Sequence, residues 1–336
     1  MDETDQAASA ERLREQFHQD GFVIVRNALT HEELGILQRE VDCLMNFLIS
    51  ENYDIMKDFG GIIEPISCGY IDPPATQMYI LSKRAYSSIR NLVTEDPDTV
   101  VPLLFEKMAA LAKNFLPTAD TGDYPICLFN EQYIVKTPKS DATSAFAWHQ
   151  DSEYMDPTAQ KDFPIVSCWT ALDDVNKSNG TLIVEPFPRP TNTGSGSAFT
   201  LPSSLNDRTA LLQYHKRLAA CYGKELDKDD ALARALKPRS PTSATIEESR
   251  ATLSNPDDTM DPRMRFTFER QEPVLVEIPA GSIVFLSGLV RHCSLGNSSS
   301  KFRRAYMPQF SSGKVVGEEE RLVSLAVPVD DTHHRS

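Results

Sequence analysis

The sequence of 336 residues predicts an α+β protein with helices first and an antiparallel double sheet after them. Three observations support this fold class. Up to about residue 116, apolar residues recur at helical spacing. From about residue 124, short β-rich runs follow one another, separated by Pro, Gly, Asn and Asp. No internal repeat and no linker divides the chain, so we expect a single domain over residues 1–336.

The first part of the chain, residues 1–120, is expected to be mostly helical. Leu13 and Phe17 lie one helical turn apart in a short helix that Gly21 ends. The run Phe-Val-Ile-Val at 22–25 then has the composition of a buried strand.

A capping box marks the start of the next helix. Thr30 and Glu33 have the spacing with which each side chain binds the other residue's backbone amide. The apolar face of this helix is expected to be Leu34, Leu37, Val41, Leu44, Met45 and Leu48. A second long helix is expected around residues 98–116.

The strands are expected in two blocks, 121–186 and 264–312, that together form the core. The expected strands are 127–136, 145–151, 165–172, 181–185, 265–269, 274–278, 283–287 and 303–310. Asn179-Gly180 is a strong hairpin signal, and residues 279–282 form a tight turn.

An insertion at 187–263 interrupts the strands and contains two expected helices, at about 207–222 and 229–237. It could be a surface decoration, an oligomer contact or a lid. We favour a lid over the barrel mouth, because long insertions beside a site usually carry function.

Composition narrows the classes of function. There are 34 Lys and Arg against 48 Asp and Glu, a net charge of −14, and no basic cluster, which argues against nucleic acid and anionic membranes as partners. The six cysteines are dispersed, as is typical of reduced thiols. Because the N-terminal segment is acidic and polar, we expect no signal or transit peptide and a cytoplasmic protein.

Two of the seven histidines stand out. We expect the other five, His18, His31, His215, His333 and His334, to be structural or solvated, on helical surface or in the charged tail. His149 and His292, in contrast, both fall among strands beside polar residues.

His149-Gln150-Asp151 places an imidazole and a carboxylate at i and i+2, the same face of a strand. With His292 from a neighbouring strand they would complete a 2-His-1-carboxylate triad, the ligand set of non-haem Fe(II) oxygenases. Arginines follow at 303 and 304, and the planar guanidinium can bind a carboxylate through two parallel hydrogen bonds. Strand parity alone does not choose between Arg303 and Arg304, since neighbours face opposite ways.

Several motifs along the chain resemble the phytanoyl-CoA dioxygenase family of Fe(II)/2-oxoglutarate-dependent oxygenases. They are the segments 17–30, 148–154 (Trp-His-Gln-Asp-Ser-Glu-Tyr), 167–172, 179–186 (Asn-Gly-Thr-Leu-Ile-Val-Glu-Pro) and 292–304. In the last segment the arginine at 303 stands eleven positions after the histidine, as in the family.

The resemblance implies a double-stranded β-helix (a cupin-like jelly roll) with flanking N-terminal helices. It implies Fe(II), 2-oxoglutarate and dioxygen as cofactor and cosubstrates. His149, Asp151 and His292 would be the metal ligands and catalytic centre. The 2-oxoglutarate residues would be Arg303, Ser294, Trp169 and Gln132. Phe146, Tyr154 and Met155, beside the metal motif, could form the substrate wall or pack in the core.

The activity implied is oxidation of a small, fairly apolar organic molecule, a natural-product intermediate, with release of succinate and CO2. Hydroxylation, desaturation and cyclisation all remain open. The alternatives are an acyl-CoA 2-hydroxylase, a zinc hydrolase with the same ligands, and a silent ligand-binding protein. Asp151 argues against a halogenase. Residues after Pro186 lack the family's Gly-Ser/Thr-His, which leaves the substrate in doubt. A monomer or homodimer is expected.

Overall fold

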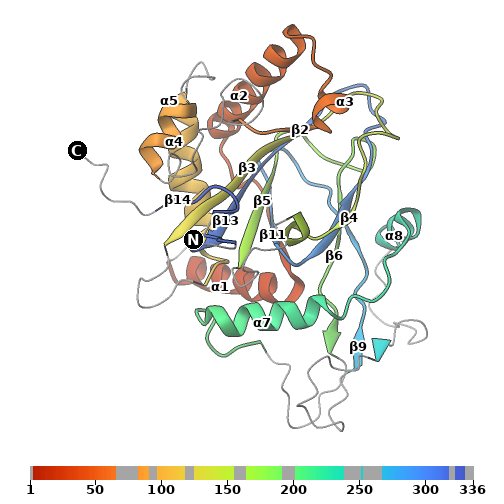
Figure 1. Ribbon diagram of the computed structural model, residues 1–336. Helices are drawn as coiled ribbons and strands as arrows, with labels where there is room; N and C mark the ends of the chain where they lie inside the picture. The colour runs from red at the N-terminus through yellow and green to blue at the C-terminus, as the bar shows by residue number, and fades with distance from the viewer. Residues whose placement is uncertain are drawn as a thin grey trace.

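The computed structural model describes residues 3–65, 82–90, 97–117, 125–154, 164–190, 201–237, 251–252, 267–317 and 322–329. Two antiparallel sheets form a double-stranded β-helix, with helices of the N-terminal part against one of them (Figure 1). The predicted fold class is therefore confirmed. No helix in the described part of the chain is long and apolar enough to cross a membrane.

The helices of the N-terminal part begin and end near the signals in the sequence. α1 (Glu3–Asp20) is longer than predicted and ends before Gly21, which has a positive φ of 79°. β1 (Phe22–Val25) follows as predicted. α2 (His31–Ser50) starts with both hydrogen bonds of the predicted capping box.

The helix predicted at 98–116 is present but is not one regular helix. It consists of α5 (Pro97–Pro102), a π-helical segment (Leu103–Met108) and α6 (Ala109–Lys113). Pro102 removes one backbone donor from the α-helical ladder at the point where the π-helix begins. Two shorter helices, α3 (Ile55–Phe59) and α4 (Lys83–Arg90), complete this part.

The larger sheet has the order β1-β11-β5-β13-β3-β14, with β2 (Ile62–Ile63) also on β3. The other strands are β3 (Ile126–Lys136), β5 (Ile165–Ala171), β11 (Ile283–Ser287), β13 (Arg303–Ser312) and β14 (Val327–Pro328). Its outer face packs on the N-terminal helices through residues such as Cys168, Phe285 and Tyr306. Its inner face contributes Trp169, Ala305 and Met307 to the barrel interior.

The smaller sheet has the order β10-β6-β12-β4. Its strands are β4 (Phe146–His149), β6 (Leu182–Glu185), β10 (Val274–Leu275) and β12 (Arg291–Ser294). Leu182 and Val184 face the barrel interior. Ile183 and Cys293 face outward against Ala231 of α8 (Lys228–Ala235).

The hairpin predicted at Asn179-Gly180 is wrong. The strands before and after it, β5 and β6, lie in different sheets, so this turn carries the chain from one sheet to the other. Gly180 is needed because its φ is 86° and a Cβ there would come within 2.7 Å of the Lys136 side chain.

The insertion forms α7 (Arg208–Ala219) and α8, close to the two helices predicted. α7 runs beside α1 below the strand ends (Figure 1). Its Leu218 packs with Phe187 and Val290 at that end of the barrel. A small third sheet, β7 (Arg189–Pro190), β9 (Thr267–Glu269) and β8 (Ala251–Thr252), lies where the insertion leaves and rejoins the core. Residues 191–200, 238–250 and 253–266 lie outside the described residues.

Candidate metal centre

The three predicted ligands meet at one point of the barrel. His149 and His292 are direct partners on β4 and β12, and their ring centroids are 4.2 Å apart. Asp151 Oδ1 lies 3.8 Å from His149 Nε2 and 3.7 Å from His292 Nε2. One ligand atom from each residue lies within 4.8 Å of the others, so the three can hold a metal ion.

Asp151 reaches this point by a different route from the one predicted. The strand expected at 145–151 ends at His149, and Asp151 is the first residue of a 3-10 helix (Asp151–Tyr154). His149 and Asp151 therefore do not lie on one face of a strand, as predicted, although their side chains do converge. The turn brings the carboxylate beneath β5, where it meets a hydroxyl donor described below.

Backbone carbonyls fix how the two imidazoles are oriented. Nδ1 of His149 donates to the Ala147 carbonyl at 2.8 Å, and Nδ1 of His292 donates to the Val290 carbonyl at 3.2 Å. In a neutral ring with this tautomer Nε2 carries no proton and can bind a metal, and both Nε2 atoms face Asp151. Burial lowers the pKa of His292, which favours the neutral form that binds metal.

A chain of hydrogen bonds holds the carboxylate ligand. Asn130 Nδ2 donates to Gln309 Oε1 at 3.1 Å, Gln309 Nε2 donates to Ser167 Oγ at 2.7 Å, and the Ser167 hydroxyl donates to Asp151 Oδ2. Oδ1 is left to face the imidazoles. Ser167 and Gln309 were not predicted from the sequence. Strand parity could have found them, because they lie on the faces of Trp169 and Arg303.

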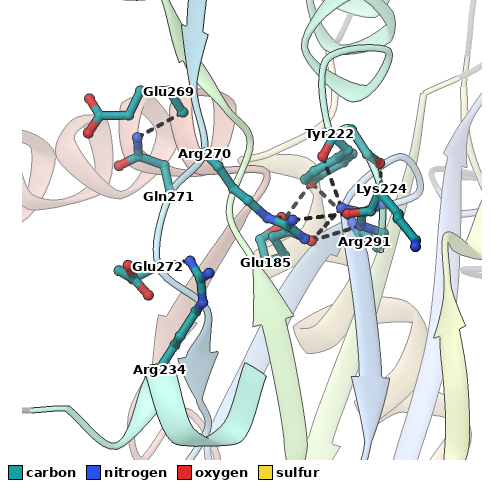
Figure 2. Close-up of polar contacts among 10 residues, drawn as sticks. Glu185, Tyr222, Lys224, Arg234, Glu269, Arg270, Gln271, Glu272 and Arg291 are labelled. Carbon is teal, nitrogen blue, oxygen red and sulfur yellow. Dashed lines mark hydrogen bonds and ion pairs between the residues drawn. The ribbon is translucent and has the colours of Figure 1, made fainter. Parts of the chain in front are cut away.

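The residue before His292 is anchored in a buried ionic cluster (Figure 2). Glu185 is fully buried and binds both Arg270 and Arg291, with Arg291 Nε donating to Oε2 at 2.8 Å. The Tyr222 hydroxyl accepts from the Arg291 amide at 3.1 Å and donates to the Glu185 carbonyl at 3.0 Å. Through Tyr222, the insertion thus stabilises the end of β12 that carries the metal ligand His292.

The two neighbouring arginines have opposite environments. Arg303 is fully buried inside the barrel and donates to the Gly180 carbonyl at 2.8 Å. Its Nε and Nη1 atoms have no hydrogen-bond partner among the residues that the structure describes. Arg304 points outward and binds Asp173 through two nitrogens, at 3.1 and 2.7 Å, and Asp42 at 2.7 Å.

A second buried basic side chain, Lys136, lies beside Arg303 and was not predicted. The two are direct partners on β3 and β13. Lys136 Nζ donates to Ser294 Oγ at 2.7 Å and to the Leu295 carbonyl. Burial, together with the nearby Arg303, lowers the pKa of Lys136 to about 5, and burial lowers the pKa of Arg303 to about 9.

The other predicted residues surround these cations. The guanidinium of Arg303 lies 5.5 Å from the ring centroid of Trp169, and Lys136 Nζ lies 5.2 Å from that of Phe146. Gln132 is partly buried and pairs with Met307. Tyr154 ends the 3-10 helix, and Met155 lies outside the described residues.

Comparison with known proteins identifies the family. The sequence profile of the family described as phytanoyl-CoA dioxygenase (PhyH) matches residues 17–186, half of the chain. This chain belongs to the phytanoyl-CoA dioxygenase family. It is 22% identical over 315 residues to a phytanoyl-CoA dioxygenase domain-containing protein 1 homolog from Caenorhabditis elegans, with 88% of each chain covered.

Solved structures of similar shape include two proteins of low sequence identity. The non-heme alpha ketoglutarate dependent epimerase SnoN from nogalamycin biosynthesis is 15% identical, with 97% of this chain and 89% of that chain covered and a TM-score of 0.48. EvdO2 from Micromonospora carbonacea var. aurantiaca, complexed with 2-oxoglutarate, is 20% identical, with 92% and 93% covered and a TM-score of 0.45.

Proposed function

We propose that this protein is an Fe(II)/2-oxoglutarate-dependent oxygenase that oxidises a small, fairly apolar organic molecule and releases succinate and CO2. The observation that carries the proposal is a metal triad and a buried pair of basic side chains, Arg303 and Lys136, inside one barrel, with no carboxylate paired to either among the described residues. The triad has the ligand types that non-haem Fe(II) enzymes use. Arg303 has the positive charge and Lys136 the amine with which a carboxylate of a dicarboxylate can bind.

The spacing between triad and cations suits 2-oxoglutarate. Ser294 is two residues beyond His292 on β12, which is about 7 Å along a strand. Its hydroxyl touches Lys136, the partner of Arg303. A five-carbon dicarboxylate can therefore bind the metal with its keto-acid end while Arg303 and Lys136 bind its far carboxylate.

The roles of the chain's own residues follow from this arrangement. His149, Asp151 and His292 would hold Fe(II), which together with 2-oxoglutarate supplies the activation of dioxygen. Ser167 would keep Asp151 Oδ2 occupied, so that Oδ1 serves as a single ligand atom. Trp169 would flank the cosubstrate beneath Arg303. The apolar inner walls, such as Val184 and Met307, exclude water from the reacting groups.

Two properties of the protein bear on the substrate class. The barrel interior is lined mainly by apolar side chains, and the chain carries a net charge of −14. Both favour an apolar intermediate of natural-product metabolism over an acyl-CoA thioester, whose phosphates would need basic residues. We infer that the insertion, through Tyr222 and Leu218, closes the barrel end during turnover, as a lid does.

The test is succinate formation by the purified protein supplied with Fe(II), 2-oxoglutarate and air, followed by NMR. We expect succinate from the wild type and none from Asp151→Ala. A zinc hydrolase would leave 2-oxoglutarate unchanged. Full succinate production by iron-loaded Asp151→Ala would overturn the metal assignment.

A further inference from the structure

A cavity of about 200 Å³ lies between α1, α7 and the ends of β5 and β11. Most of its wall is apolar: Phe17, Phe115, Ile165, Leu211, Leu212 and Leu289. Phe17 and Phe115 belong to the core on the outer side of the larger sheet. None of the three candidate metal ligands lines the cavity within the described part of the chain. The cavity is therefore distinct from the metal centre.

Two buried histidines belong to the polar part of the cavity wall, which also includes Gln150, Ser152, Glu153, Lys216 and Ser287. His18 and His215 were expected on helical surface, but only 1% and 8% of their areas are exposed. His18 Nδ1 lies 3.3 Å from His215 Nε2, and His215 Nδ1 lies 3.2 Å from Ser287 Oγ. His18 Nε2, the last atom of this row of hydrogen bonds, is buried without a hydrogen-bond partner in the described residues. Such an atom calls for a partner.

The hydrogen bonds among His18, His215 and Ser287 determine which kind of group can bind to His18 Nε2. Burial lowers the pKa of His18 to about 2 and of His215 to about 4, so both rings are neutral near pH 7. Each ring then has one donor and one acceptor nitrogen. If His215 donates to Ser287, His18 Nε2 is an acceptor; if Ser287 donates to His215, His18 Nε2 carries the proton. A hydroxyl group suits both arrangements, because it can donate or accept.

We propose that this cavity is a binding site for a small, mainly apolar alcohol or phenol whose hydroxyl bonds to His18 Nε2. An apolar engineered cavity of about 150 Å³ holds benzene, so about 200 Å³ accommodates one ring with a hydroxyl. The apolar wall would bind the ring and the histidine would select the hydroxyl. This site goes beyond the proposed oxygenase function and does not depend on it.

The site adjoins the segments that carry two metal ligands. Gln150 Nε2 donates to the Leu289 carbonyl at 2.5 Å, and the Ser152 amide donates to the Gly288 carbonyl at 2.9 Å. All four residues line the cavity, and they flank Asp151 or precede His292. An occupant therefore contacts both ligand-bearing segments without touching the ligands.

The test is calorimetric titration of the metal-free full chain with phenol and with benzene. We expect the wild type to bind phenol at least as tightly as benzene. In His18→Phe the hydroxyl is buried without a partner, so phenol should weaken about tenfold relative to benzene. Leu212→Trp fills the cavity and should abolish binding of both. His31→Phe, at an exposed histidine of α2, should change nothing.

The proposal fails if neither probe binds up to its solubility limit, or if His18→Phe leaves the ratio of the two affinities unchanged. Should His18→Phe not fold, the imidazole ¹⁵N signals of the wild type decide the matter. Phenol should shift the His18 Nε2 signal and leave His31 in place. An unshifted His18 signal at saturating phenol would also overturn it.

Discussion

The two faces of β3 and β13 both bury charge, and they bury it in opposite ways. On the outer face Arg90 of α4 binds Glu40 of α2 and Glu131 of β3. Tyr133 donates to Glu40, and Tyr306 donates to Glu131. Burial and the neighbouring Glu40 raise the pKa of Glu131 well above its ordinary value, which favours the neutral form of this carboxyl. The outer cluster is therefore close to neutral.

On the inner face the same strands bury two basic side chains, the charged guanidinium of Arg303 and the amine of Lys136. No carboxylate forms an ion pair with either one among the described residues. A buried charge without a partner is costly, because it gives up hydration and gains little in return. This difference indicates which cluster is structural. In the outer cluster the charges are paired, and it holds helices to the sheet. In the inner cluster the positive charge has no paired carboxylate among the described residues, so it is suited to bind an anion.

The largest effect is expected at the outer cluster. Arg90→Met leaves Glu40 and Glu131 buried against each other without their cation, which should lower the free energy of unfolding by about 3–5 kcal/mol. Urea denaturation measures it. The double variant with Glu131→Gln should recover part of the loss, because one of the opposed carboxyls becomes an amide. A change below about 1 kcal/mol in Arg90→Met would contradict the structural role.

The next effect is expected at Arg303 and should appear in binding, not in stability. Arg303→Met removes the proposed partner of the far carboxylate and should raise the Kd of 2-oxoglutarate by about ten- to thousandfold. The free energy of unfolding should stay within about 1 kcal/mol or increase, since an uncompensated buried charge is lost. Titration of the Fe(II)-loaded protein without oxygen, and urea denaturation, measure the two quantities.

Arg304→Met is the matched control for this prediction. Arg304 is already bound to Asp173 and Asp42 on the outer side, so its loss should change the Kd of 2-oxoglutarate less than threefold. The opposite ranking of the two variants would make Arg304 the anchor.

A smaller effect is expected where the inner face meets the metal ligands. Ser167→Ala removes the hydroxyl that holds Asp151 Oδ2, and metal affinity should fall by about ten- to a hundredfold. Ser311→Ala is the control, because Ser311 is equally buried on β13 and binds only the Gly313 carbonyl among the described contacts. Titration with Fe(II) under argon measures both. Equal affinity in Ser167→Ala and wild type would show that the hydroxyl does not position the ligand.

Local signals predicted most of the core strands, and the motifs around His149, Asp151 and His292 predicted the triad. β12, which carries His292, was not among the predicted strands. Alternation and turn residues predicted β1, β3, β5 and β11 to within a residue at each end. The Asn-Gly signal failed because it describes a local turn and not which sheet the next strand joins.

Residues whose roles come from tertiary contacts could not be predicted in this way. Lys136 is one charged residue at the end of an apolar strand, and only its pairing with Arg303 reveals two cations together. His18 and His215 are 197 positions apart in the chain, and nothing local indicates that α1 and α7 meet. Long-range contacts decide these roles.

The smallest expected effect concerns protons at Lys136. Burial lowers its pKa in the free protein to about 5, so the amine is neutral near pH 7.5. A bound carboxylate favours the ammonium form and raises this pKa, and 2-oxoglutarate binding should then take up about one proton. Because protons are bound with the ligand, affinity should weaken as pH rises, by up to tenfold per pH unit. The window from pH 7 to 8 isolates Lys136, since Arg303, with a pKa of about 9, stays largely charged there.

Calorimetry in two buffers of different ionisation enthalpy counts these protons directly. Lys136→Met should bind 2-oxoglutarate with no proton uptake and with an affinity nearly independent of pH in this window, because no other inner-face cation then changes its charge. Arg304→Met, whose cation is already paired on the outer face, should keep the uptake of the wild type. Binding by the wild type without proton uptake would mean that Lys136 stays neutral beside the carboxylate. The inner face would then hold its anion with one charge, that of Arg303, and the amine would serve as a hydrogen-bond donor alone.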